Sequence, residues 1–159
     1  TSAGNSMEKF ARALLADDCP EMNRQMQQVV LQCASSFDSG VKPSNGTIQP
    51  ENFFHGLTLG MLTCLLESYH LTSNRESGLG RYDICLEPIR NETGNAYILE
   101  FKVFSETEWD QDLTDTAKRA RAQIEEKRYD AELLAKGFQK EKIHKYGFGF
   151  RGKEVIICT

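Results

Sequence analysis

The sequence has no long hydrophobic run: none of its apolar segments approaches the roughly 20 residues that a membrane-spanning helix needs. The N-terminal stretch TSAGNSMEKF also lacks the hydrophobic region of a secretory signal. We therefore expect a cytoplasmic protein with no membrane contact. Residues 1–6, before Met7, are set aside as a cloning remnant, and the expected domain covers residues 7–159, as a fragment of a longer chain.

The sequence also lacks paired cysteine motifs and a basic excess. No CxxC spacing occurs among its five cysteines, and their odd number and scatter favour buried, reduced thiols over a disulfide scaffold or a zinc site. The net charge of −4 argues against non-specific binding to a polyanion. Residues 106–115 carry five acidic and no basic residues, whereas residues 118–145 carry nine basic against five acidic ones. A solvated helix face is the ordinary interpretation of that basic segment.

Hydrophobic periodicity predicts helices and strands in a mixed order. Helices are expected over 6–17, with Ser6 as the N-cap, and over 21–37, 51–67, 113–128 and 130–137. The Gly-, Pro- and Ser-rich residues 38–50 form a loop. Extended segments are expected over 69–76, 81–88, 96–103, 146–150 and 154–159, with hairpins joining the second to the third and the fourth to the fifth. This order predicts an α/β domain whose central sheet is covered by helices on both faces.

One predicted strand, AYILEFKV, is interrupted by two charges. Side chains alternate across a strand, so Glu100 and Lys102 point to the same face. If the preceding hairpin folds about Glu92 and Thr93, Asp83 lies opposite Lys102. The three charged groups then cluster on one face of two adjacent strands.

Two carboxylates a few ångströms apart raise one another's pKa unless a cation lies between them. Hard carboxylate oxygens suit Mg²⁺ or Mn²⁺. Lys102 can then hold or deprotonate a water molecule, or stabilise negative charge on a phosphate. The cluster therefore favours a metal-dependent hydrolytic site. The alternative, a partly buried ionic network that only adds fold specificity, stays open.

These segments resemble a known superfamily. GRYDICLEP followed by AYILEFKV resembles the Asp and Glu-x-Lys motifs of the PD-(D/E)XK nucleases, although Tyr82 stands where the superfamily usually has proline. More narrowly, ENFFHGLTLGMLTCLL, SNRESGLGRYDICL, ILEFKV, QIEEKRY and YGFGFRGKEVII resemble, in this order, the nuclease-like domains at the C-terminus of AAA-ATPase-like bacterial proteins. The resemblance implies a restriction-endonuclease-like core of order αβββαβ, with a central mixed sheet flanked by helices and with extra N-terminal helices.

The resemblance also implies roles for four residues. Asp83, Glu100 and the backbone carbonyl of Phe101 would bind Mg²⁺ or Mn²⁺, and Lys102 would be the catalytic lysine alongside the two carboxylates. The substrate would be nucleic acid, with DNA favoured over RNA. The partner would be an AAA-ATPase-like domain in the same full-length chain, and a homo-oligomer stays open.

Further candidates have ordinary alternatives. Superfamily members often add a ligand from the first core helix, for which Glu51 and His55 are available, but a histidine there is more often a core group. Glu76 either adds an acidic ligand or fixes its own loop through an arginine. Five residues are candidates for substrate binding, although those on the helix equally suit a polar helix face: Gln123, Lys127, Tyr129, Arg81 and Arg75.

The leading functional prediction is a metal-dependent nuclease. A non-catalytic binding or regulatory module attached to an AAA-type ATPase is the alternative, and the acidic net charge favours it. A third interpretation is an intact site that is inactive without the ATPase part of the chain.

Overall fold

The computed structural model describes residues 2–37, 50–90 and 94–159. Residues 38–49 of the predicted loop and the hairpin turn about Glu92 and Thr93 lie outside these ranges, and Pro50, the last residue of that loop, begins a helix instead. Three helices begin the chain: α1 (Ser2–Leu15), α2 (Cys19–Phe37) and α3 (Pro50–Leu62), the last ending in a short 3-10 turn, η1 (Thr63–Leu65). Because α1 begins at Ser2, the prediction of Ser6 as an N-cap is wrong. The Ser6 hydroxyl instead donates a hydrogen bond to Gln28 Oε1 of α2 (3.0 Å).

Five strands form one mixed sheet in the order β1-β4-β5-β6-β7. They are β1 (Tyr69–Ser73), β4 (Ile84–Pro88), β5 (Ala96–Val103), β6 (Ile143–Arg151) and β7 (Glu154–Cys158). All neighbours are antiparallel except β5 and β6, which are parallel. Between β1 and β4 the chain forms a separate small hairpin of β2 (Glu76–Ser77) and β3 (Gly80–Arg81).

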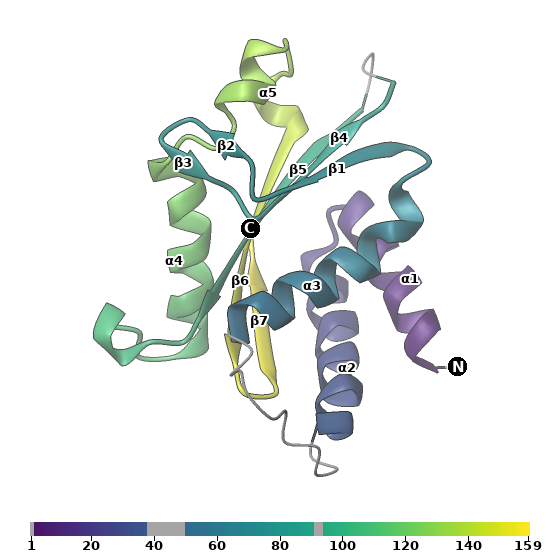
Figure 1. Ribbon diagram of the computed structural model, residues 1–159, viewed down its shortest axis with the longest axis vertical. Coiled ribbons are helices and arrows are strands. Elements are labelled where there is room, and N and C mark those ends of the chain that lie inside the picture. Colours follow the sequence, from purple (N-terminus) through teal and green to yellow (C-terminus); the bar gives the residue numbers. More distant parts are fainter. Residues whose placement is uncertain (1, 38–49, 91–93) are drawn as a thin grey trace, which may run out of the picture.

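The connection from β5 to β6 carries the remaining helices. It contains η2 (Glu106–Glu108), α4 (Leu113–Glu126), α5 (Ala131–Ala135) and η3 (Lys140–Lys142). The predicted αβββαβ order is therefore confirmed as α3, β1, β4, β5, α4 and β6, with β7 added at the sheet edge. The first three helices lie on one face of the sheet and α4 on the other (Figure 1).

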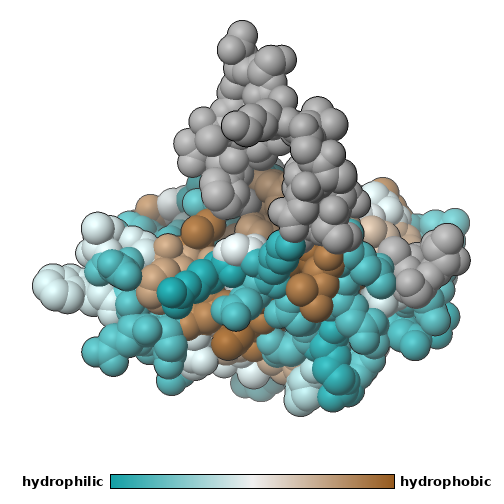
Figure 2. Space-filling view, turned by 90° about the horizontal axis from the view of Figure 1, so that it is seen from below, coloured by the Kyte–Doolittle hydropathy of each residue, from teal (hydrophilic) through white to brown (hydrophobic). Residues whose placement is uncertain are grey.

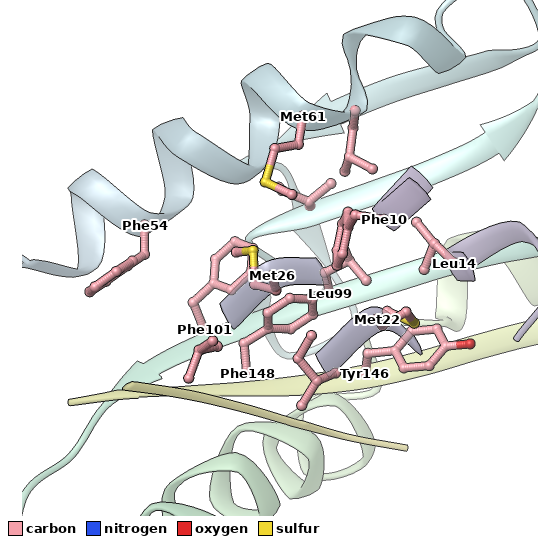
Figure 3. Packing of buried hydrophobic residues seen from close by; sticks show 14 of the residues in the cluster. Phe10, Leu14, Met22, Met26, Phe54, Met61, Leu99, Phe101, Tyr146 and Phe148 are labelled. Carbon is pink, nitrogen blue, oxygen red and sulfur yellow. The ribbon is translucent and has the colours of Figure 1, made fainter. Parts of the chain in front are cut away.

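Each face of the sheet has its own hydrophobic cluster. On the side of α1–α3, aromatic and methionine side chains from helices and strands interdigitate, among them Phe10, Met26, Phe101 and Phe148 (Figure 3). On the side of α4, a smaller cluster includes Ile98, Ile124 and Tyr129 together with Leu133 of α5. The strands are thus buried on both faces, as the apolar runs in the sequence predict.

The register of the β4–β5 hairpin differs from the predicted one. Ile84 pairs with Leu99 and Leu86 with Tyr97, so that Asp83 lies beside Glu100 and not opposite Lys102. The predicted register is wrong by two residues. Because side chains alternate with a period of two, such a shift leaves every side chain on its own face, and the hydrophobic pattern cannot distinguish the two registers.

Helix α4 packs directly on the backbone of β6. A methyl group added at Gly147 would lie 2.2 Å from the Ala117 carbonyl oxygen, and one at Gly149 would lie 2.8 Å from the Ala117 backbone nitrogen. In the sequence YGFGF the aromatic side chains pack in the α1–α3 cluster, and the two glycines leave the strand backbone uncovered on the side that faces α4. The small buried alanines of α4 allow the helix to pack closely against this backbone.

None of the described helices has the length and apolarity that crossing a bilayer requires. The surface seen from the end where β6 turns into β7 is mostly hydrophilic, with smaller apolar areas between polar ones (Figure 2). All five cysteines are free thiols. Only Cys85 is buried. The expectation of buried thiols is wrong for Cys64, which is exposed, and for the partly exposed Cys19, Cys33 and Cys158.

We predict that Gly147→Ala destabilises the fold by about 1–3 kcal/mol. The added methyl group would clash with the backbone of α4, which cannot move aside as a flexible side chain could. Urea unfolding followed by circular dichroism measures the loss. The matched control is Gly60→Ala in α3, where an added methyl group meets nothing within 4 Å. That control should be neutral or stabilising by up to about 1 kcal/mol. Equal stabilities for the two variants would contradict the close packing of α4 on β6.

Candidate active site

Asp83 lies just before β4, at the point where β5 loses its β4 neighbour and continues paired with β6 alone. The β4–β5 ladder is paired from Ile84 onward, while β5 runs on to Val103. Asp83 fills the place of the missing strand residue: its Oδ2 accepts a hydrogen bond from the Phe101 amide (2.8 Å). Its own amide donates to Glu100 Oε2 (3.3 Å). The backbone of each strand thus holds the carboxylate of the other.

Glu100 is buried on the α4 side of the sheet, with 4% of its surface exposed. Its Oε1 accepts a hydrogen bond from Gln123 Nε2 of α4 (2.5 Å). The same nitrogen donates to the hydroxyl of Tyr129 (2.9 Å). Gln123 and Tyr129, two of the candidates for substrate binding, therefore meet beside this carboxylate, and together they restrict its orientation.

Burial, followed by the charge of Asp83, raises the pKa of Glu100 to about 9, although the Lys102 ammonium opposes the shift. Burial likewise raises the pKa of Asp83, against the Phe101 amide, His55 and Lys102. A hydrogen bond between the two carboxyl groups raises the pKa of Glu100 and lowers that of Asp83. Both shifts disfavour two charged carboxylates side by side, and a shared proton or a bound cation would relieve this repulsion.

Two further groups complete this edge of β5. Lys102 is partly buried and makes no hydrogen bond or ion pair with any residue in the described ranges, so its ammonium remains available. In a strand, the N–H and C=O of one residue point to the same side. Because the Phe101 amide faces Asp83, the Phe101 carbonyl also points toward the edge that β4 leaves open.

Helix α3 lines the site from the other face. His55 is buried; its Nδ1 lies 4.0 Å from Asp83 Oδ1 and its Nε2 shares a hydrogen bond with Ser73 Oγ (2.6 Å). Glu51 lies one helical turn earlier. Partial desolvation and the charge of Asp83 raise its pKa, and Lys102 and His55 lower it. Both α3 candidates therefore lie close enough to interact with the carboxylate pair.

The remaining candidates lie outside the carboxylate pair. Glu76 has a side chain 83% exposed, 3.7 Å from Arg81, and makes no contact with the two carboxylates in the described part of the chain. Arg75 pairs with Glu132 of α5 (3.1 Å), which fixes the loop at the base of the small hairpin. Lys127 is exposed, at the C-terminal end of α4.

Sequence reasoning missed two supporting contacts. Ser73 orients His55, but a serine at the end of a strand carries no signal of such a role. Arg119 binds both oxygens of Asp110 (3.1 and 2.8 Å) and holds the pKa of that carboxyl at about 2. This pair anchors the acidic loop after β5, on which Trp109 is 88% exposed.

The residues fit a hard divalent cation. No group of three or more His, Cys, Asp or Glu residues suited to a metal occurs in the described residues. Two carboxylates and one backbone carbonyl nevertheless match the needs of Mg²⁺, which usually keeps several water molecules and takes only one or two protein carboxylates. Burial and the charge of Asp83 raise the pKa of Glu100, and a cation bound between the two carboxylates would oppose that shift.

A mixed sheet flanked by helices, with a carboxylate pair and a lysine at the end of two central strands, defines a restriction-endonuclease-like protein. The chain belongs to the PD-(D/E)XK nuclease superfamily, whose family model matches residues 49–159. Members of this superfamily are generally nuclease hydrolases that use divalent metals, typically Mg²⁺. No curated protein and no solved structure matches the chain.

We predict that Glu100→Gln stabilises the metal-free protein increasingly as the pH rises from 5 to about 9. A carboxyl whose pKa is raised by folding contributes its full stability below its unfolded pKa. That contribution is lost as the pH approaches the folded pKa, by at most about 1.4 kcal/mol per pH unit. Gln resembles the protonated carboxyl and does not titrate. Thermal unfolding in EDTA across this pH range measures the difference.

A divalent metal should reverse the order of stability of the unmodified chain and Glu100→Gln. With Mn²⁺ present, the unmodified chain should gain thermal stability, since a ligand that binds the folded state stabilises it, and Glu100→Gln should gain little. A difference between the two proteins that does not change with pH would contradict the buried, proton-sharing pair.

Proposed function

We propose that this chain is a metal-dependent phosphodiesterase that cleaves nucleic acid, with DNA as the favoured substrate. The observation that supports the proposal most is the exchange of hydrogen bonds between Asp83 and β5. It holds two carboxylates against each other in a buried place and leaves Lys102 unpaired beside them among the described residues. A purely structural network would pair that lysine.

In this proposal each side chain has a separate task. Asp83, Glu100 and the Phe101 carbonyl hold Mg²⁺ or Mn²⁺ at the open edge of β5. Gln123 and Tyr129 orient Glu100 and keep its second oxygen turned toward Asp83. When bound, the cation supplies positive charge to the scissile phosphate and lowers the pKa of the attacking water.

The Lys102 ammonium orients that water or neutralises charge that develops on the phosphate. On the α3 side, His55 and Glu51 lie near Asp83, where they bias its orientation or bind an outer water of the cation. Both tasks use groups that the fold already places beside the carboxylate pair. No large rearrangement of the described residues is therefore needed to assemble the site.

The place of this domain in a longer chain is part of the proposal. The resemblance to nuclease-like domains of AAA-ATPase-like proteins supports an ATPase partner in the same full-length chain, and the free thiols suit a reducing cytoplasm. The net charge of −4 favours the rival function, a non-catalytic module attached to that ATPase. Activity assays on the domain alone and on the full-length chain separate the two.

We predict that Lys102→Ala lowers the rate of DNA cleavage by about 100-fold or more and leaves Mn²⁺ binding intact, since the lysine acts on the reacting groups and is no metal ligand. Asp83→Asn should abolish both cleavage and metal binding. Cleavage of labelled DNA and RNA measures the first property, and isothermal titration with Mn²⁺ measures the second.

The matched control is Lys140→Ala, an exposed lysine in η3, which should cleave as the unmodified chain does. Circular dichroism establishes that each variant is folded. Cleavage by Lys102→Ala at the unmodified rate would contradict the catalytic assignment. Mn²⁺ binding without any cleavage, by the domain and by the full-length chain alike, would favour the non-catalytic module.

A further inference from the structure

The small hairpin of β2 and β3 carries an exposed apolar residue at its tip. Leu79, in the turn between the two strands, is 70% exposed. A shallow hollow beside it is lined by the hairpin residues themselves, including Gly78, Gly80 and Arg81. The hairpin leads straight into Asp83, and it lies next to the C-terminal end of α4 (Figure 1).

The exposure of Leu79 is not the result of a loose turn. Its amide donates a hydrogen bond to the Lys127 carbonyl (2.7 Å), and the Ser77 hydroxyl donates to the Tyr129 carbonyl (2.9 Å). Gly78 has a positive φ of 62°, and a methyl group there would lie 2.2 Å from the Arg128 carbonyl oxygen. The tip is therefore docked on the segment that follows α4, with its leucine held outward.

The hairpin also contacts the network that orients Glu100. A methyl group at Gly80 would lie 3.2–3.3 Å from the ring and hydroxyl of Tyr129. That hydroxyl is bonded to Gln123, and Gln123 is bonded to Glu100. Only two side chains thus separate the hairpin from the carboxylate pair.

Two cations, Arg81 and Lys127, lie beside the tip. The Arg81 side chain is 61% exposed, and its only ion pair among the described residues is a long one, 3.7 Å, with the highly exposed Glu76. Such a surface pair contributes little and exchanges readily for a phosphate. Lys127 is exposed, and its side chain passes close to Gly80.

The opposite border of the site is acidic. The loop after β5 carries Glu106 and Glu108, and the charges of Glu108 and Glu51 both act on Arg119. Phosphates are therefore repelled at that border and attracted at the hairpin. An apolar tip flanked by cations suits a nucleic-acid strand, whose phosphates bind cations and whose sugars and base edges contact apolar side chains.

We propose that the β2–β3 hairpin is the substrate-engaging element of this protein. Arg81 and Lys127 bind phosphates adjacent to the scissile one, and Leu79 packs against the sugar and base edge of the same strand. This assignment rests on the proposed nuclease function. It predicts the path of the nucleic-acid strand across the site, from the cationic hairpin toward the carboxylate pair.

The test measures binding of short fluorescein-labelled duplex and single-stranded DNA by fluorescence anisotropy. It uses the Lys102→Ala background with Mn²⁺, at several salt concentrations. Leu79→Ser should weaken binding about 10-fold with an unchanged salt dependence, because it removes apolar contact only. Arg81→Gln should weaken binding and reduce the slope of log affinity against log salt by about 1, because one phosphate contact is lost.

The controls are Leu66→Ser, an exposed leucine beyond α3, and Lys140→Gln in η3; both should bind as the background does. Unchanged Mn²⁺ affinity in the hairpin variants shows that the Tyr129–Gln123–Glu100 network is intact. If both hairpin variants keep the background affinity and salt slope while the unmodified chain cleaves DNA, the hairpin assignment is overturned and the nuclease function stands. Hairpin-dependent binding without cleavage by the unmodified chain overturns the nuclease function alone.

Discussion

The structure depends on the two hydrogen bonds by which Asp83 and β5 hold each other. Where β4 gives way to the small hairpin, β5 would present an unpaired amide at Phe101, and a buried, unpaired donor is costly. The Asp83 carboxylate satisfies that donor, and its own amide satisfies an oxygen of Glu100. One exchange thus ends the strand pairing and brings two acidic groups together. The position of the site follows from the way in which the sheet ends.

This arrangement is unfavourable for the metal-free fold. Burial raises the pKa of both carboxyl groups, so folding disfavours their charged forms. The fold tolerates the pair because three of the four carboxylate oxygens accept a hydrogen bond and because the Lys102 ammonium lies near. Local conflicts of this kind, where propensity and burial favour an apolar residue and the chain has a charge, are typical of functional sites. Here the conflict concerns charge and leaves the backbone of β5 regular over its whole length.

Much of this could be predicted from the sequence, and the errors have physical causes. Periodicity located the core helices and the strands, and the spacing of Asp83, Glu100 and Lys102 predicted a cluster on two adjacent strands. The register was wrong because a shift of two residues preserves the hydrophobic pattern, so only the turn could have fixed it. The arginine partner of Glu76 was among the predicted alternatives, since Arg81 lies in the same loop. The partner of His55 was not predicted, because that contact depends on which residues distant in the chain become neighbours, and a single sequence does not record this.

The packing of α4 connects the fold to the chemistry. Because β6 carries glycine where α4 crosses it, the helix lies against the strand backbone at a distance that no side chain would permit. The same helix presents Gln123 to Glu100, and the segment after it presents Tyr129 and supports the small hairpin. A helix displaced outward by one methyl group would move the donor away from the carboxylate as well as weaken the core. The aromatic–glycine alternation of β6 therefore serves the site as much as the sheet, although neither glycine touches a reacting group. The residues that set the distance between α4 and the sheet therefore also determine the strength of the hydrogen bond from Gln123 to Glu100.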